Sequence, residues 1–283
     1  LGEGLDDQSV SASITTSSLN AIVDVFSGRD LQIFTTGGEF YIPQSVGEPI
    51  TPGNLTVKVA TRNGAKPGVP VAGLDSGTIF VQRQGKSLNE LLFTDAELAY
   101  TTAALSLLSG HLLKSPTDMS IRRATSTEES DRLFIVNGDD GTMSVFSLNR
   151  AQQVIAPSSF TTDGNFEAVG IDIDTAYVIV KRTIGGAAKY YVEIFDSTLH
   201  TDSAVYSASA SATGAAAQLE GKLLDIIVDG NVQADKTVSS GTVTFDNASA
   251  SNYEIGLPFA ISIVTMPVEP RLQSGSIKGF KKR

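Results

Sequence analysis

The stretch "TAYVIVKRTIGGAAKYYVEIF", Thr175 to Phe195, reads as two β-strands folded back on each other at Gly185-Gly186. Both halves are rich in Val, Ile and Tyr, which favour strands. The Gly-Gly pair between them supplies the positive φ angles that a tight hairpin turn requires. The stretch therefore predicts a β-hairpin with no chemically reactive side chain at its tip.

The same pattern recurs four more times. The other predicted hairpins, each with its turn, are Leu31–Ile42 at Gly37-Gly38, Gly77–Phe93 at Gln84-Gly85, Arg132–Leu148 at Asn137 to Gly141, and Lys222–Val238 at Asp229-Gly230-Asn231. Two further strands, "QQVIAPSSF" and "FEAVGIDID", separate the Arg132–Leu148 hairpin from Thr175. Successive antiparallel strands of this length suit four-stranded propeller blades, and they suit a sandwich nearly as well. We therefore predict an all-β fold: a β-propeller-like array of antiparallel hairpins with a small additional β-barrel or sandwich domain.

Very little helix is predicted. The one fair candidate is "TTAALSLLSG", where Thr101 or Thr102 would be the N-cap and Gly110 the stop, with leucines at three- and four-residue spacing. A second segment, Ala212–Gly221, is Ala-rich but short.

The composition also suggests how the chain divides. The run "SAVYSASASATG" is of low complexity and reads as a linker. The predicted organisation is a β-propeller-like domain over 1–205, a Ser/Ala-rich linker over 206–218 and a small β-rich domain over 219–283. The acidic start "LGEGLDDQSV", which lacks Met, and the end "GSIKGFKKR" both read as cut ends of a longer chain.

Bulk composition excludes several classes of protein. The 283 residues, 41% of them hydrophobic, can bury one large core or two modest ones. The absence of cysteine excludes disulfides and thiolate metal sites. No apolar run approaches the roughly 20 residues that span a bilayer, so no membrane-spanning segment is predicted.

The charge argues against a protein that holds nucleic acid. A formal net charge of -10 would repel phosphates rather than neutralise them, although nucleic acid could still pass along such a surface. The basic stretch Arg62–Gly68 is isolated and reads as a loop.

Three acidic or amide side chains at one turn resemble a calcium site. Asn137, Asp139 and Asp140 lie together, but the spacing of Gly and Glu that an EF-hand loop requires is missing. Asn-Gly and Asp-Gly are also what a hairpin turn needs without any metal, so we interpret the segment as a turn.

Asp172 and Asp174 stand two apart in a predicted strand and would share one face. Paired carboxylates can perform acid–base chemistry when burial raises the pKa of one of them. Because Ile171 and Ile173 alternate with them, a half-buried strand with a solvated acidic face is the favoured interpretation.

The remaining chemistry is sparse. His111 and His200, the only histidines, share no motif with each other or with a serine nucleophile. The Gly-rich segments "TTGGE" and "RTIGGAAK" lack the spacing of a phosphate-binding loop. The sequence therefore predicts no catalytic, cofactor-binding or metal-binding residues, no cofactor and no enzymatic activity.

Four segments, in order along the chain, resemble a family of structural proteins from short-tailed (podovirus-type) bacteriophages: the tail tube or nozzle proteins, also called phage stabilisation proteins. Leu219–Phe259 resembles the family's LEGK…ADG…V…G…L…A…VGLPY segment, and Gly77–Phe93 resembles its LFVQRGGRKVREL hairpin. "GRDLQIFTTGGEFYI" followed by "ITPGNLTVKVATRNGA" is similar to GRDLLVGTSGGEW…ITPTN…R…YG. "YVIVKRTIGGAAKYYVEIF" is similar to LWLVVKRTINGQTKRYIE.

The sequence departs from the family pattern at aromatic and basic positions. Phe40 stands at the Trp of GGEW, and Phe259 stands at the Tyr of GLPY. These changes keep aromatic bulk but remove any role for an indole N–H or a phenol. Arg83 and Lys86 keep the basic character of the VQRGGRK hairpin only in part.

The resemblance implies a role in the virion tail. It implies a ring of identical subunits, a hexamer, that forms the lower part of the tail tube. The ring would join an adaptor or gatekeeper ring and fibre proteins, and viral DNA would pass through its lumen at ejection without specific binding. A net negative charge suits such a conduit, because it repels phosphates.

Two other functions stay open. A propeller-type glycoside hydrolase would need two carboxylates about 5 to 10 Å apart, and Asp172 and Asp174 or Glu193 are the only faintly suggestive set. A tail-associated receptor- or carbohydrate-binding β module would need exposed aromatic residues. Tyr190 and Tyr191 are candidates, but they alternate in direction, so one of them is expected in the core.

Overall fold

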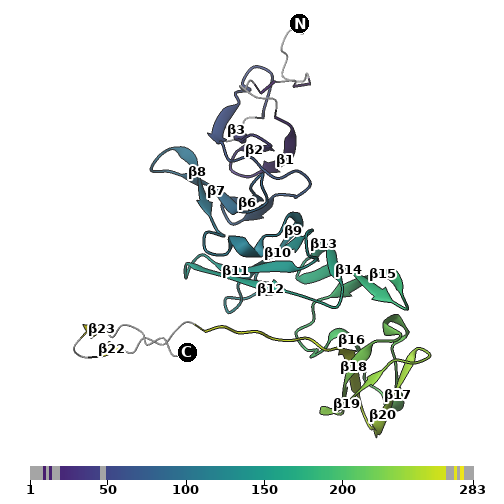
Figure 1. Ribbon diagram of the computed structural model, residues 1–283. Helices are drawn as coiled ribbons and strands as arrows, with labels where there is room; N and C mark the ends of the chain where they lie inside the picture. The colour runs from purple at the N-terminus through teal and green to yellow at the C-terminus, as the bar shows by residue number, and fades with distance from the viewer. Residues whose placement is uncertain are drawn as a thin grey trace.

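The computed structural model describes residues 9–10, 13–14, 20–44, 49–265, 271–272 and 275–276 (Figure 1). Over these residues the fold is all-β, which confirms the predicted class. All strand pairs are antiparallel and no described sheet closes into a barrel. The only helical elements in this part of the chain are two short 3-10 turns, η1 (Gly110–Leu112) and η2 (Ala217–Leu219).

Four sheets follow one another along the chain, and each is a meander of consecutive strands. The first contains β1 (Ile22–Ser27), β2 (Leu31–Thr35), β3 (Glu39–Ile42) and β4 (Lys58–Thr61). The second contains β5 (Ala72–Leu74), β6 (Gly77–Val81), β7 (Leu88–Thr94) and β8 (Ala99–Ala104). The third contains β9 (Pro116–Arg122), β10 (Asp131–Asn137), β11 (Met143–Asn149) and β12 (Val154–Phe160). The fourth contains β13 (Asn165–Asp172), β14 (Thr175–Ile184) and β15 (Ala187–Ile194).

The four sheets stack face to face, because successive side chains of a strand point to opposite faces. In β10, Leu133 and Ile135 join a core with the second sheet, whereas Phe134 and Val136 join a core with the fourth. Both faces of this strand are therefore buried. Apolar side chains of the first and second sheets form a further core.

This stack is open. In Figure 1 the first sheet lies at one end of the series and the fourth lies at the other. The arrangement has the blade-like meanders expected of a propeller, but the described sheets form an arc and not a closed ring.

A second β unit follows the fourth sheet. It contains β16 (Asp202–Ser207), β17 (Ser211–Ala215), β18 (Leu223–Val228), β19 (Asn231–Thr237), β20 (Thr242–Ser249) and β21 (Tyr253–Leu257). Its strands form a four-stranded sheet in the order β16-β21-β18-β19 and a two-stranded sheet β17-β20 around one apolar core. Beyond it, β22 (Arg271–Leu272) pairs with β23 (Gly275–Ser276).

The five predicted hairpins are all present, but their glycines act in two ways. Gly185 and Gly186 have φ angles of 60° and 78°, as the turn between β14 and β15 requires. Gly37 and Gly38 are not among the positive-φ glycines. At Gly38 a Cβ would lie 2.8 Å from the carbonyl oxygen of Thr61, so close approach of the backbone selects glycine there.

The predicted helix over Thr101–Gly110 is wrong. Thr101 and Thr102 belong to β8, where they pair with Leu92 and Leu91 of β7. β-Branched threonines fit a strand well, and pairing with the apolar β7 outweighs the weak helical spacing of the leucines. The short Ala-rich segment Ala212–Gly221 likewise holds β17 and η2.

The predicted linker over 206–218 is also wrong. This stretch contributes the end of β16, all of β17 and the η2 turn to the second unit. Ala216 and Leu219 are buried in the core of that unit. Small residues here allow close packing, so their low complexity does not indicate a loose connection.

Among the described residues, no helix is long and apolar enough to cross a membrane.

Candidate functional site

The turn with Asn137, Asp139 and Asp140 is a structural feature. The buried amide of Asn137 donates to the carbonyl oxygen of Leu112 at 2.9 Å and to hydroxyl oxygens of Thr142 and Ser144, both at 3.0 Å. Asp140 forms an ion pair with Lys114. Partial burial alone would raise the pKa of the Asp140 carboxyl group, but hydrogen bonds from Lys114 and Thr142 together lower it. The turn is thus tied to the segment before β9 through its own polar groups.

The two aspartates Asp172 and Asp174 do not share a strand face. Asp172 ends β13 opposite Thr175, so Ile173 and Asp174 form the turn to β14. Ile173 has a φ of 56° and is 89% exposed, which corrects the expectation that it alternates into a core. Both aspartates are exposed to solvent, as the favoured interpretation predicted.

The histidines lie in separate places. His111 is part of η1, and the backbone N–H of His200 donates to Glu254 at 2.7 Å. No group of three or more His, Cys, Asp or Glu that could hold a metal ion exists within the described ranges. The basic stretch Arg62–Gly68 is a loop, as predicted, and backbone hydrogen bonds from Ala65 to Thr35 and from Lys66 to Val81 tie it to the first two sheets.

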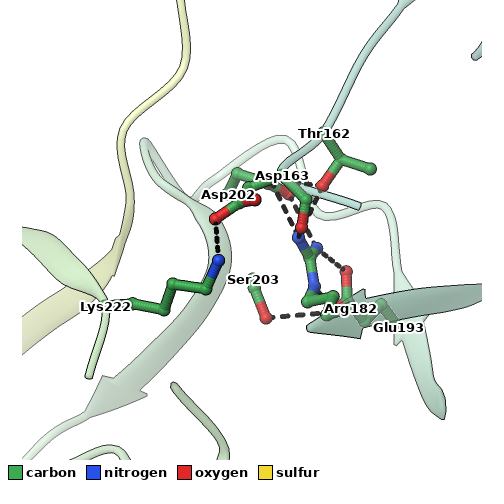
Figure 2. A network of polar contacts seen from close by, with 7 residues as sticks. All are labelled: Thr162, Asp163, Arg182, Glu193, Asp202, Ser203 and Lys222. Carbon is green, nitrogen blue, oxygen red and sulfur yellow. Dashed lines mark hydrogen bonds and ion pairs between the residues drawn. The ribbon is translucent and has the colours of Figure 1, made fainter. Parts of the chain in front are cut away.

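The densest polar cluster surrounds Arg182, which sequence reasoning missed (Figure 2). The guanidinium is fully buried and grips Glu193 with two hydrogen bonds, at 2.9 Å from Nε and 2.7 Å from Nη2. Nη1 donates to the hydroxyl of Thr162 at 2.7 Å and to the carbonyl oxygen of Asp163 at 2.9 Å. Asp202 supplies a second carboxylate, 3.4 Å from Nη2.

These contacts fix the charge of the guanidinium. Burial alone would lower the pKa of Arg182, but the hydrogen bonds to Glu193 and the negative charges of Asp202 and Glu193 raise it. A buried charge is tolerated only when it is paired and hydrogen-bonded in this way.

The Arg182 cluster joins the two parts of the fold. Arg182 and Glu193 belong to the fourth sheet, whereas Asp202 and Ser203 belong to β16 of the second unit. Ser203 donates to Glu193 at 3.0 Å, and Lys222 pairs with Asp163 at 2.6 Å. We therefore call the cluster a clamp. Both carboxylate oxygens of Glu193 take part in it through their hydrogen bonds with Arg182.

One feature of the sequence indicates this clamp: every second residue of the β14 strand is apolar except for one arginine. Val178, Val180, Arg182 and Ile184 alternate along β14 and are all buried. An arginine within an otherwise apolar series predicts a buried, paired charge. The pattern does not identify its partners, because Glu193 lies opposite Val178 in the hairpin and Thr162 and Asp202 lie outside the hairpin.

The opposite face of the fourth sheet is apolar and uncovered. We call it the outer face; its large exposed side chains are Tyr177 (40%), Ile179 (40%), Tyr190 (61%), Val192 (72%) and Ile194 (54%). They form direct cross-strand pairs, since Tyr177 lies opposite Ile194 and Ile179 lies opposite Val192. Lys181 lies beside Tyr190, with its Nζ 5.7 Å from the ring centre.

Tyr190 and Tyr191 point in opposite directions, as predicted. Tyr190 lies on the outer face. Tyr191 packs against the core of the second unit, and its hydroxyl donates to the carbonyl oxygen of Gln218 at 3.0 Å. Only one of the two is available to a partner.

In comparisons with known proteins, no protein-family model and no curated protein matches the chain.

Proposed function

We propose that this chain is a structural subunit of the tail tube, or nozzle, of a short-tailed bacteriophage. In this proposal it assembles with copies of itself into a ring, a hexamer, that forms the DNA-ejection conduit of the virion tail. It joins an adaptor or gatekeeper ring and fibre proteins there, and it performs no bond chemistry. Four segments that resemble the nozzle family, in the family's order, support this assignment.

The observation that carries the proposal is the uncovered outer face. In the stack, each inner sheet is covered on both sides by apolar side chains of its neighbours. The fourth sheet has the same apolar alternation on its outer face, yet no described residue covers it. An exposed apolar patch of this kind is typical of a surface that joins another protein.

The electrostatics agree with a conduit. The chain has a formal net charge of -10, and phosphates are repelled by such a surface. DNA would therefore pass through the ring without being retained.

The test is cryo-electron microscopy of purified tails from the phage that encodes the chain. We expect density for this fold in copies arranged around the tail axis, below the adaptor ring. Absence of the chain from the tail would contradict the proposal, and so would its presence only at the tips of fibres.

A receptor- or carbohydrate-binding module is the second candidate. It is favoured by the exposed rings of Tyr177 and Tyr190 on one face, because aromatic rings stack on sugars and fill partner surfaces. Binding of host-surface glycans by the wild type, lost in Tyr190→Ala, would support this candidate over the nozzle.

A further inference from the structure

The fourth sheet is one strand short of its neighbours. The first three sheets each have four strands, whereas the fourth has three and ends at β15. The backbone edge of β15 that faces away from β14 makes no hydrogen bond to any described residue. Open edges of this kind accept further strands.

This edge also carries apolar side chains. Tyr190, Val192 and Ile194 alternate along β15 on the outer face, and all three are more than half exposed. A strand placed beside β15 would cover one side of these three side chains. It would also form hydrogen bonds with the free backbone groups of β15.

The chain contains a matching segment, residues 258–265, which we call the arm. Its sequence "PFAISIVT" carries no charge, and Phe259, Ile261 and Ile263 alternate as in a half-buried strand. They are 53%, 76% and 80% exposed. No backbone group of the arm has a hydrogen-bond partner among the described residues.

The arm is directed away from β15 of its own copy. In Figure 1 it leaves the second unit after β21 and extends on the side opposite to β15. A second copy is therefore the occupant that fits this edge, since it brings an apolar segment whose backbone has no partner within the described part of its own chain.

We propose that the arm of one copy adds to the β15 edge of a neighbouring copy and completes its fourth sheet. Phe259, Ile261 and Ile263 then lie beside Tyr190, Val192 and Ile194, because side chains two apart share a face. The arm and the edge are different surfaces, so the contact is head-to-tail and generates either a ring or a filament. As the contact between subunits of a ring, the inference rests on the proposed function.

Site-directed cross-linking tests the contact, because the chain contains no cysteine of its own. Val192→Cys and Ile261→Cys proteins, one of them isotope-labelled, are mixed and mildly oxidised. We expect a disulfide that joins one labelled and one unlabelled chain. The matched control replaces Val192→Cys with Ile155→Cys, on the edge of the complete third sheet, and should give no more than background cross-linking.

Two outcomes would overturn the inference. One is cross-linking of Val192→Cys to Ile261→Cys that does not exceed the Ile155→Cys control. The other comes from the chain with both Val192→Cys and Ile261→Cys: a disulfide found only within single chains would place the arm on its own copy.

Sedimentation analysis of Ile261→Asp combined with Ile263→Asp gives an independent test. These side chains touch no core, so the thermal unfolding of the variant should match that of the wild type. We expect its self-association to weaken by at least about tenfold. Unchanged association of this variant would overturn the arm contact but would leave the nozzle proposal standing. Open filaments joined by the Val192→Cys to Ile261→Cys disulfide would support the arm contact and contradict the ring.

Discussion

At the scale of single residues, Arg182 shows how this chain uses its charges. The side chain is fully buried and lies between Glu193 of its own sheet and Asp202 of the next unit. Its two hydrogen bonds to Glu193 form the bidentate geometry that only arginine provides. A fully buried charge thus holds two parts of the fold together.

We expect Arg182→Ala to lower the free energy of unfolding by about 3 kcal/mol or more, because it leaves two partly buried carboxylates without a counter-charge. Denaturant unfolding followed by circular dichroism measures the change. Arg182→Lys is the matched control, because it keeps the charge but loses the bidentate contact. Its free energy of unfolding should lie between those of the wild type and Arg182→Ala. A loss below about 0.5 kcal/mol in Arg182→Ala would show that the clamp does not stabilise the fold.

Because of Tyr100, we expect the stability of the fold to decrease at alkaline pH. Burial, together with the hydrogen bond to Asp30 at 2.9 Å and the charge of Asp30, raises the pKa of Tyr100 to about 12. The fold therefore favours the protonated phenol, and this stabilisation is complete below the ordinary pKa of 10.0 and is lost as the pH rises through about 12.

The measurement compares the wild type with Tyr100→Phe by urea unfolding at several pH values. The stability advantage of the wild type should shrink steadily above about pH 10, since the variant has no phenol to ionise. Other titrating groups are common to both proteins and cancel in the difference. An advantage that stays constant up to about pH 12 would rule out this role of Tyr100.

At the scale of elements, the turns set the hairpins. Gly185-Gly186 and Asp229-Gly230 each place two positive φ angles between paired strands. Asp229 also accepts backbone hydrogen bonds from Ala250, Ser251 and Asn252, and these bonds lower the pKa of its carboxyl group. Local turn chemistry and strand pairing thus favour the same structure.

Gly185→Val should destabilise the fold by about 1 to 2 kcal/mol, because a β-branched residue is strained at a φ of 60°. A Cβ at this position meets no atom within 4 Å, so the cost comes from the backbone alone. Thermal unfolding measures it. Gly185→Asn is the control, since asparagine tolerates this conformation and should cost less. Equal melting of the wild type and Gly185→Val would contradict the assignment.

The hairpins could be predicted from the sequence because both strands and the turn lie within one short window. The helix over Thr101–Gly110 was predicted wrongly, because the partner of β8 is β7 and helical spacing says nothing about pairing. The linker over 206–218 was predicted wrongly for a similar reason: β16 pairs with β21, far along the chain. The partners of Arg182 were missed because they come from three separate segments.

At the scale of the whole molecule, the sheets form a stack that ends in an uncovered face. Apolar cores join the sheets of the stack, and one side of β10 packs on the second sheet while the other packs on the fourth. The outer face and the arm repeat this apolar alternation without a partner among the described residues. We interpret both as surfaces for assembly.

Val192→Asp tests whether the outer face serves association rather than folding. Val192 is 72% exposed, so an aspartate there keeps its hydration and should change the melting temperature little. Self-association, measured by light scattering after size-exclusion chromatography, should weaken. Ala187→Asp, at an exposed position on the same strand but on the other face, is the control because it adds the same single negative charge. If both variants associate as strongly as the wild type, the outer face is not a contact surface between copies.

We propose above all that this chain is a rigid building unit that joins copies of itself. Native mass spectrometry of the intact protein from purified tails tests that claim directly. We predict one dominant species with the mass of six identical subunits. A stable monomer at every concentration would contradict the account.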